Sequence, residues 1–278
     1  FHERQERAHP LARHLLERIA DGADRLRGYY SAVSASEILV RPIRAGDASV
    51  LVAGGMESMN QAPYLLRQAR TGYRLGHGQL EDAVITDGLW CTIEGCHMGT
   101  HAERVAIKAG VEREAQDAFA LESHRRAVAA QDEGRFDDEL VPVTVRDAKG
   151  REARVTADES PRRDTTAEAL AKLRPAFDLP TGSDRGSTAT GSVTAGNAPG
   201  ITDGAAATVV ASERAVERYG LGPLARIVGY AQAEVAPKWL FLAPVEGVRA
   251  LEARTEIPVD AYDLIEINEA FAAQTLAD

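Results

Sequence analysis

Short apolar segments alternate with helical patterns through the last third of this chain, and this alternation constrains its fold more than any other feature. An apolar stretch at 205–211 precedes a helical pattern at 213–219 and a strand pattern at 225–230. A second helical pattern follows at 245–254, and a second strand pattern at 262–267. Strands and helices that alternate at this spacing predict a layered α/β fold.

Earlier segments agree with that fold class. Residues 48–53 form a nearly continuous apolar run that ends at Gly54 and Gly55, which predicts a buried strand followed by a tight turn. The other elements are predicted from hydrophobic periodicity, and they are helices at 1–28, 99–109, 112–133 and 165–173 and a strand at 140–145.

The composition excludes several classes of protein. The chain has 278 residues, of which 44% are hydrophobic, so it can bury a sizeable core in one large domain or two smaller ones. Its 42 acidic and 32 basic residues give a net charge of −10, which argues against a nucleic-acid partner and leaves room for a local basic pocket. No apolar run reaches the ~18 residues of a membrane helix, so no membrane partner is expected.

Cys91 and Cys96 are the only cysteines. Two thiols provide no disulfide framework, so we expect a reducing, cytoplasmic compartment. The run from Cys91 through Cys96 to His97 lacks a second pair of ligands at zinc spacing, and we predict no metal site there. A single histidine at the start of a helix, as predicted for His97, is more often structural than catalytic.

Small residues dominate a long segment before the final alternating elements. Residues 178–203 consist largely of Gly, Ser, Thr, Ala and Pro, a composition typical of a loop or linker. The run at 194–207 permits a close approach of its backbone to a ligand or to a neighbouring element. From the residues alone, both a structural loop and a ligand-binding loop remain open.

Two polar pairs also allow two interpretations each. Asn268 and Glu269 follow the predicted strand at 262–267, where strand ends line clefts in α/β sheets and an Asn amide can donate to a carbonyl or hold a water. For Asn268 and Glu269, a helix cap is the alternative.

Arg162 and Arg163 can bind a phosphate together, or they can simply face solvent.

Five motifs, in this order, resemble the thiolase family (acetyl-CoA C-acyltransferases). They are AGGMESM at 53–59, GCHMGTHAE at 95–103, LRPAF at 173–177, TAGNAPGITDGAAA at 194–207 and INEAFAAQ at 267–274. The resemblance extends over about residues 44–278, and the ordered combination is highly specific.

The resemblance implies a thiolase-like α/β fold of αβαβα layers, with a loop domain inserted in the first of two similar halves and with part of the fold missing from this chain. Residues 1–43 are unmatched, 44–60 end the N-terminal half, 61–190 form the loop domain, and 191–278 begin the C-terminal half. By family analogy, the expected assembly is a homodimer or a homotetramer.

The resemblance also implies an acyltransferase. In the family, a cysteine thiolate attacks an acyl-CoA thioester, and the acyl-enzyme then reacts with a second CoA compound in a ping-pong reaction. Such enzymes condense two acetyl-CoA molecules or cleave a 3-ketoacyl-CoA with CoA. Coenzyme A thioesters are therefore expected as substrates, without a separate cofactor.

The resemblance assigns one catalytic position and eight binding positions. Asn268 matches the Asn that holds the water of the oxyanion hole, where fixed donors stabilise the developing enolate charge. The binding positions are Ala270 and Phe271 beside that hole, His97 and Met98 at the pantetheine and acyl group, Arg162 at the nucleotide end of CoA, and Phe177, Ala195 and Gly196 along the pantetheine tunnel.

The family's three reactive side chains are not found where the resemblance places them. Counted without gaps from Gly46, the nucleophilic cysteine falls on Tyr29, whose bulk and pKa of about 10 prevent it from replacing a thiolate. The loops with the catalytic His and the second Cys are expected beyond Asp278. We therefore expect a chain truncated at both ends, with thiolase activity in its full-length parent. The alternatives are a non-catalytic CoA-binding or oligomer-forming protein and a non-functional product.

Overall fold

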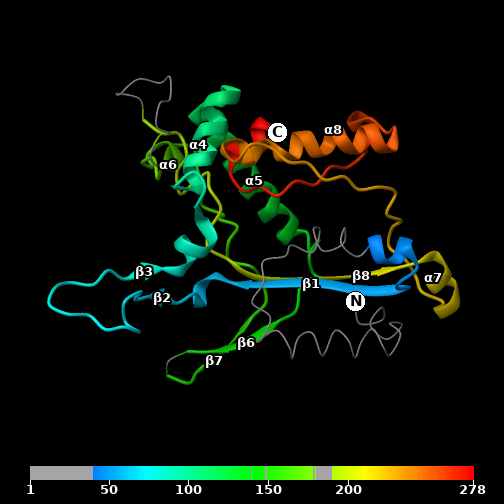
Figure 1. Cartoon of the computed structure of the whole chain (residues 1–278), viewed down its shortest axis with the longest axis horizontal. Helices are drawn as coiled ribbons and strands as arrows, with labels where there is room; N and C mark the ends of the chain where they lie inside the picture. Colours follow the sequence, from blue (N-terminus) through cyan, green and yellow to red (C-terminus); the bar gives the residue numbers. More distant parts are fainter. Residues whose placement is uncertain (1–39, 139, 148, 178, 180–189) are drawn as a thin grey trace. The chain divides into compact units, whose positions relative to one another are not determined.

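The computed structural model describes residues 40–138, 140–147, 149–177, 179 and 190–278 (Figure 1). These residues divide between two compact units. The first holds residues 40–88 and 201–230, and the second holds the described residues of 89–200 together with 231–278. The predicted helix at 1–28 and the position of Tyr29 lie outside the described residues.

Two long strands form the frame of the first unit. β1 (Val50–Ser58) pairs with β8 (Asp203–Ala211) in antiparallel register, with Val52 opposite Val209 (Figure 1). Valine favours the extended conformation because its branched Cβ restricts χ1. The structure confirms that both apolar segments are extended, and it pairs them across a sequence separation that no local pattern reveals.

β1 continues through Gly54 and Gly55, where the sequence pattern predicted a tight turn. Gly54 lies opposite Ala207, inside the ladder. Each ladder hydrogen bond satisfies a backbone group, and this gain outweighs the conformational freedom that favours glycine in turns. The predicted turn is therefore wrong, and the chain leaves the strand only at η2 (Met59–Gln61).

Shorter elements complete the first unit. β2 (Tyr64–Leu65) pairs with β3 (Glu81–Asp82), and α7 (Glu213–Tyr219) follows β8. The Ser212 hydroxyl accepts a hydrogen bond from the first turn of α7, and Gly220 ends the helix with a φ of 59°. These two signals are visible in the sequence, and the prediction of this helix is confirmed.

Helices dominate the second unit. α4 (Met98–Ala109) begins after His97 and ends at Gly110, whose φ of 68° lies in the left-handed region that glycine tolerates. α5 (Arg113–Asp132) follows directly, so both predicted helices are confirmed. The other helical elements of this unit include α6 (Ala167–Ala171), η4 (Pro237–Leu242), α8 (Ala243–Thr255), η5 (Val259–Ala261) and α9 (Ala272–Ala277). A further helical element, η3 (Val84–Leu89), lies in the first unit except for its last residue.

Two antiparallel hairpins also belong to the second unit. β4 (Trp90–Cys91) pairs with β5 (Cys96–His97), and β6 (Val143–Arg146) pairs with β7 (Glu152–Val155). The predicted strand at 140–145 is thus confirmed with a later start.

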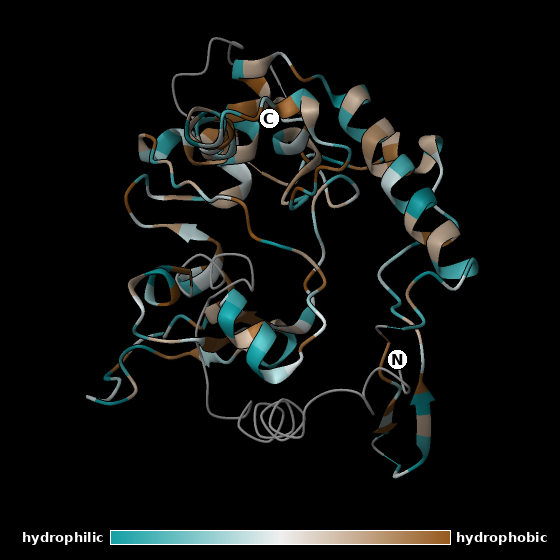
Figure 2. Cartoon of the chain, turned by 90° about the vertical axis from the view of Figure 1, so that its right-hand side faces the viewer, coloured by the Kyte–Doolittle hydropathy of each residue, from teal (hydrophilic) through white to brown (hydrophobic). Residues whose placement is uncertain are grey.

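Two further predicted strands, 225–230 and 262–267, have no regular structure. A strand needs a neighbour for its N–H and C=O groups, and neither segment has one among the described residues. Their apolar side chains stay accessible, with Val228 65% and Leu264 86% exposed. Figure 2 shows apolar residues (brown) in irregular segments as well as in helices. The strand predictions are wrong for these two segments.

The core of the second unit forms where α4 packs against α9. Ala102 and Ala106 are one helical turn apart on α4 and fully buried, and such small side chains allow a close approach of the neighbouring helix. The buried cluster consists of Ala102, Ala106, Val111, Val193, Phe271 and Ala273.

Candidate functional site

Three rings from distant parts of the sequence meet in the second unit. The ring of His97 stacks on that of Phe177, with centroids 4.7 Å apart and planes inclined by 22°. Phe177 meets Phe271 edge to face, with 6.2 Å between the centroids. Pairs of aromatic rings at such spacings are favourable by about 0.5–1.5 kcal/mol beyond the burial of their area. Three residues that were predicted to bind substrate or CoA therefore form one contiguous group.

His97 is held in one orientation by the helix that follows it. Its Nδ1 accepts a hydrogen bond of 3.0 Å from the backbone N–H of Gly99, in the first turn of α4. Burial lowers the pKa of His97, so the ring is neutral at pH 7. Because Nδ1 is the acceptor, the neutral ring carries its proton on Nε2. His97 is thus a helix cap with one fixed N–H donor.

The packing of this group depends on a small residue. A Cβ at Gly99 would overlap the ring of Phe177, so only glycine allows the ring to lie against the start of α4. Met98 and Ala270 pack against the same core cluster that contains Phe271. Five of the predicted binding residues are therefore gathered in one region of the second unit.

A buried carboxylate fixes the loop next to this region. Glu103 of α4 is 1% exposed, and its Oε1 accepts hydrogen bonds of 2.7 Å from the backbone N–H groups of both Ser192 and Val193. Its Oε2 accepts a third bond, at 2.9 Å, from the Ser192 hydroxyl. No sequence motif had pointed to Glu103 as a functional residue. Its signal was an acidic residue on the helix face that also carries Ala102 and Ala106.

The same loop has a second anchor from α5. Gln116 is fully buried, and its Nε2 donates to the Ser192 hydroxyl at 2.9 Å and to the carbonyl of Val111 at 3.3 Å. Ser192 thus donates to one buried side chain and accepts from another. A hydroxyl satisfied on both sides fixes the loop firmly, because breaking either bond would leave a buried polar group unpaired.

Asn197 closes the loop on itself and ties it to α5. Its Oδ1 accepts from the backbone N–H of Thr194 at 2.8 Å, and its Nδ2 donates to Oδ1 of Asp117 at 2.9 Å. Asp117 in turn accepts a 2.7 Å ion-pair bond from Arg113. The run of small residues at 194–207 is therefore a rigid turn in its first part and belongs to β8 from Asp203 onward.

Ala195 and Gly196, both predicted along the pantetheine tunnel, lie in this rigid turn. Ala195 is exposed, whereas Gly196 is half-buried against α6 and the residues after it. A Cβ at Gly196 would lie 2.6 Å from Leu170 and 2.5 Å from Leu173. The two positions adjoin the core through Val193, which packs in the same cluster as Phe271.

Asn268 and its neighbours do not stand at a strand end. Asn268 is exposed, in an irregular segment, and its carbonyl accepts a bond from the backbone N–H of Ala270 at 2.8 Å. Glu269 accepts a 2.7 Å hydrogen bond from the Ser123 hydroxyl of α5. The cap of α9 is Phe271, without a side-chain hydrogen bond, so Asn268 is not a helix cap either.

The two arginines differ in their surroundings. Arg163 forms an ion pair with Asp132 at 2.8 Å, and this partner raises the pKa of its guanidinium. The side chain of Arg162 is exposed, while its backbone N–H donates to the His124 ring. The structure does not bring Arg162 into contact with the group of His97, Phe177 and Phe271. The residue types alone did not distinguish the two arginines, because ion pairing depends on a residue from another element, whereas the family resemblance selected Arg162.

A second histidine contacts the aromatic group through the ring of Phe241. His101 is fully buried, and its ring meets Phe241 edge to face with 6.4 Å between the centroids. Its Nδ1 lies 3.2 Å from the guanidinium of Arg104, and its Nε2 has no hydrogen-bond partner among the described residues. Burial lowers the pKa of His101, an effect that the Lys238 backbone and the Glu94 charge oppose and that the Arg104 charge reinforces. The ring is therefore neutral at pH 7.

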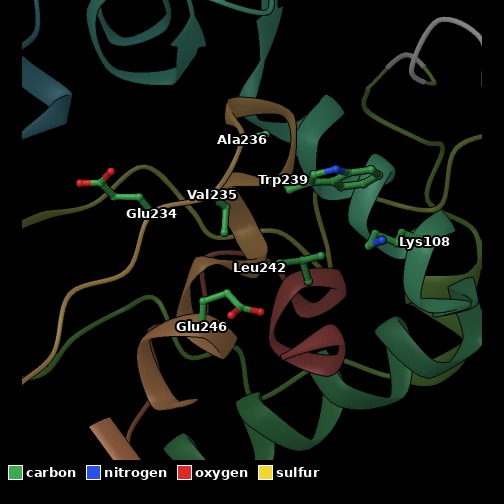
Figure 3. Close-up of a pocket in the computed structure, with 7 residues that line it drawn as sticks. All are labelled: Lys108, Glu234, Val235, Ala236, Trp239, Leu242 and Glu246. Carbon is green, nitrogen blue, oxygen red and sulfur yellow. The ribbon is translucent and has the colours of Figure 1, made fainter. Parts of the chain in front are cut away.

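A surface hollow of about 380 Å³ lies beside η4 (Figure 3). The Nζ of Lys108 lies 4.6 Å from the centroid of the Trp239 ring, a cation–π geometry. Glu234 and Glu246 add two carboxylates to the lining. None of the sequence-predicted site residues lines this hollow.

The described part of the chain contains no group of three or more His, Cys, Asp or Glu side chains arranged to hold a metal ion. Among the same residues, no helix is both long and apolar enough to cross a membrane.

Comparison with known protein families identifies the family of this chain. Residues 29–214 match the thiolase N-terminal domain, and residues 221–278 match the thiolase C-terminal domain. The chain therefore belongs to the thiolase family. This confirms the resemblance carried by the five ordered motifs.

Individual relatives agree with the family. The chain is 47% identical over 247 residues to an acetyl-CoA acetyltransferase of Pseudomonas aeruginosa, covering 89% of this chain and 60% of that protein. It is 47% identical over 248 residues to an acetyl-CoA acetyltransferase of Escherichia coli K12, with the same two coverages. The chain thus spans about 60% of the length of the curated relatives it matches.

Solved structures confirm the fold class. An acetyl-CoA acetyltransferase from Syntrophomonas wolfei superposes with a TM-score of 0.79 at 42% identity, covering 89% of this chain and 59% of that one. The human mitochondrial 3-ketoacyl-CoA thiolase gives a TM-score of 0.79 at 38% identity, covering 89% and 60%. The chain has a thiolase-like α/β fold.

Proposed function

We propose that this chain is part of an acyltransferase that exchanges acyl groups between coenzyme A thioesters by thiolase chemistry. The reaction is the condensation of two acetyl-CoA molecules, or the cleavage of a 3-ketoacyl-CoA by CoA. The observation that carries the proposal is the contiguous group of His97, Phe177 and Phe271, which three separated segments bring together beside Met98 and Ala270. The similarity to acetyl-CoA acetyltransferases supports the choice of substrate.

The proposed roles follow from the chemistry of each side chain. Apolar and aromatic walls suit the pantetheine arm and exclude water from the thioester, which strengthens polar interactions inside the site. His97 offers a fixed Nε2–H donor, and Asn268 offers an amide that can hold the oxyanion-hole water. A cysteine thiolate of the parent forms the acyl-cysteine intermediate, and CoA or the acetyl-CoA enolate then takes the acyl group.

For the 278-residue chain itself, a second function is favoured by one residue. Tyr29 stands where the family resemblance places the nucleophile, and a phenol does not form the acyl-enzyme. We propose that this chain binds acyl-CoA without turning it over. Its assembly as a homodimer or homotetramer and its cytoplasmic location stay predictions.

The adjacent arginines allow a sharp test of CoA binding. Acetyl-CoA and S-acetylpantetheine, which lacks the nucleotide, are titrated into the chain and its variants by calorimetry. Arg162→Gln should weaken acetyl-CoA binding at least about tenfold, as expected for the loss of a charge-assisted phosphate contact, and leave S-acetylpantetheine binding unchanged. Arg163→Gln is the matched control, because its guanidinium is engaged by Asp132. Equal effects of the two substitutions would contradict the assignment of Arg162.

Turnover is tested separately by thiolysis of acetoacetyl-CoA, followed by absorbance beside an intact thiolase. We expect no turnover by the 278-residue chain, because Tyr29 cannot act as the nucleophile. Turnover that disappears in Cys91→Ser or Cys96→Ser would show that a loop cysteine forms the acyl-enzyme, and the position assigned to the nucleophile would then be wrong.

A further inference from the structure

The two cysteines of the chain face each other across a hairpin. β4 and β5 pair in antiparallel register with Cys91 directly opposite Cys96, and the backbone N–H of Gly95 closes the turn by donating to the Cys91 carbonyl at 2.8 Å. Both thiols are free and half-buried. The 278 residues contain no other cysteine, so within them only these two can form an internal disulfide.

This placement matches what a disulfide requires. Directly opposed residues of an antiparallel pair have Cα atoms about 4.5–5.5 Å apart, depending on whether the pair is hydrogen-bonded. Disulfides span Cα separations of about 4.4–6.8 Å. The register of the hairpin therefore places the Cα atoms of Cys91 and Cys96 within the range of separations that a disulfide spans.

The surroundings of the pair allow a small reagent to reach it. The hairpin tip projects into solvent, and Ile93 at the tip is 75% exposed. Burial raises the pKa of the Cys96 thiol, an effect that the Arg104 cation opposes and that Cys91 and Glu94 reinforce.

We propose that Cys91 and Cys96 form a reversible redox site that takes a low-molecular-weight disulfide as its oxidant. One cysteine thiolate attacks the reagent disulfide, forms a mixed disulfide and releases one thiol. The second thiolate then attacks the protein sulfur of the mixed disulfide, forming the Cys91–Cys96 bond and releasing the second thiol. The protein loses two protons and two electrons, and the reagent disulfide gains them and becomes two thiols.

The site stands next to a residue of the candidate CoA-binding group. Cys96 is followed directly by His97, which ends β5 and caps α4. Closing the disulfide constrains the peptide immediately before that cap. The proposal does not depend on the acyltransferase function, since it concerns only the hairpin geometry.

The test measures how readily the pair closes in the folded chain. The chain is equilibrated with graded ratios of reduced and oxidised glutathione at about pH 8, in native buffer and in concentrated urea, then acid-quenched, alkylated and weighed by mass spectrometry. The folded chain should end as an internal disulfide without bound glutathione. The equilibrium with glutathione gives the effective concentration of one protein thiol toward the other. In the folded chain this value should be at least about tenfold higher than in urea, because the hairpin pre-orients the pair. Equal values in the two solvents would overturn the proposal.

Three variants separate the hairpin from simple thiol reactivity. Cys91→Ser and Cys96→Ser should each retain one glutathione as a stable mixed disulfide, because no second thiol can displace it. Gly95→Val keeps both thiols but places a β-branched residue at a φ of 64°, so its effective concentration should fall towards the urea value. An unchanged value in Gly95→Val, or a wild-type chain that ends as mixed or intermolecular disulfides, would also refute the proposal.

Discussion

The backbone N–H of Ala272 donates a hydrogen bond of 3.1 Å to the carbonyl oxygen of Asn197. This bond joins the rigid turn of the small-residue run to the first residue of α9. Because Phe271 immediately precedes Ala272, the bond also positions the Phe271 ring against Phe177. Asn197 therefore connects two motifs that the sequence separates widely, and it does so from a buried position.

Truncation of the Asn197 side chain should lower the free energy of unfolding. Asn197→Ala removes the side-chain bonds to Thr194 and Asp117 and leaves buried polar groups unpaired, so we expect a loss of about 2–4 kcal/mol in the free energy of unfolding. Asn268→Ala is the matched control. Its side chain is exposed, and its stability should stay within about 0.5 kcal/mol of the wild type. Urea denaturation followed by circular dichroism measures both, and equal losses would contradict the role given to Asn197.

The buried carboxylate of α4 supports a second prediction. Glu103→Gln keeps the shape of the side chain but removes the charge that accepts bonds from Ser192 and Val193, so we expect a destabilisation of about 1–3 kcal/mol. Glu159→Gln, at an exposed position in an irregular segment, should change stability by less than about 0.5 kcal/mol. Chemical denaturation of the two variants checks this. A Glu103→Gln variant as stable as Glu159→Gln would exclude the anchor.

Two glycines in helices should respond to alanine in opposite directions. A Cβ at Gly99 would overlap the Phe177 ring, so Gly99→Ala should destabilise by about 1–3 kcal/mol and disturb the stacking on His97. Gly247 of α8 has open space at its Cβ position, and Gly247→Ala should stabilise by about 0.5–1 kcal/mol through helix propensity. Thermal melting shows both signs. Stabilisation by Gly99→Ala would mean that Phe177 does not lie against α4.

Acid should weaken the second unit through two histidines, His101 and His97, whose pKa values burial lowers. Burial lowers the pKa of His101 and of His97 below their ordinary 6.5, so the unfolded chain binds protons first as the pH falls. The histidines therefore do not reduce the free energy of unfolding above about pH 6.5. Below that pH, each histidine lowers it by about 1.4 kcal/mol for each pH unit between its ordinary pKa and its lowered pKa.

The change in urea midpoint between about pH 7.5 and pH 5 measures this loss. His101→Gln should reduce the pH dependence, because it removes one of the titrating rings. His77→Gln is the matched control at an exposed histidine, and its pH dependence should equal that of the wild type. The same pH dependence in wild type and His101→Gln would show that His101 does not contribute.

Local signals in the sequence predicted most of the helices. Ser212 and Gly220 bracket α7, and Gly110 follows α4, whose apolar residues recur at helical spacing, so these elements form close to where the pattern places them. Capping and periodicity act over a few residues, which is why the chain itself displays them.

The strands were less predictable, because a strand is defined by its partner. The run that begins at Val50 pairs with β8, and the ladder carries it through Gly54 and Gly55 against their local preference. The segments 225–230 and 262–267 have equally good strand patterns but no partner among the described residues, and they stay irregular. A pattern cannot show whether a neighbouring strand is present.

The family and its ordered motifs were determined by the sequence alone, because residue identity in a fixed order needs no knowledge of contacts. Only the tertiary structure decided which residues of the different motifs contact one another. It showed that Phe177 reaches both His97 and Phe271, and that Glu103 and Asn197 fix the loop beside them. These relationships join residues far apart in the chain. They arise from packing and from hydrogen bonds between buried polar groups, and local sequence patterns do not specify which residues become partners.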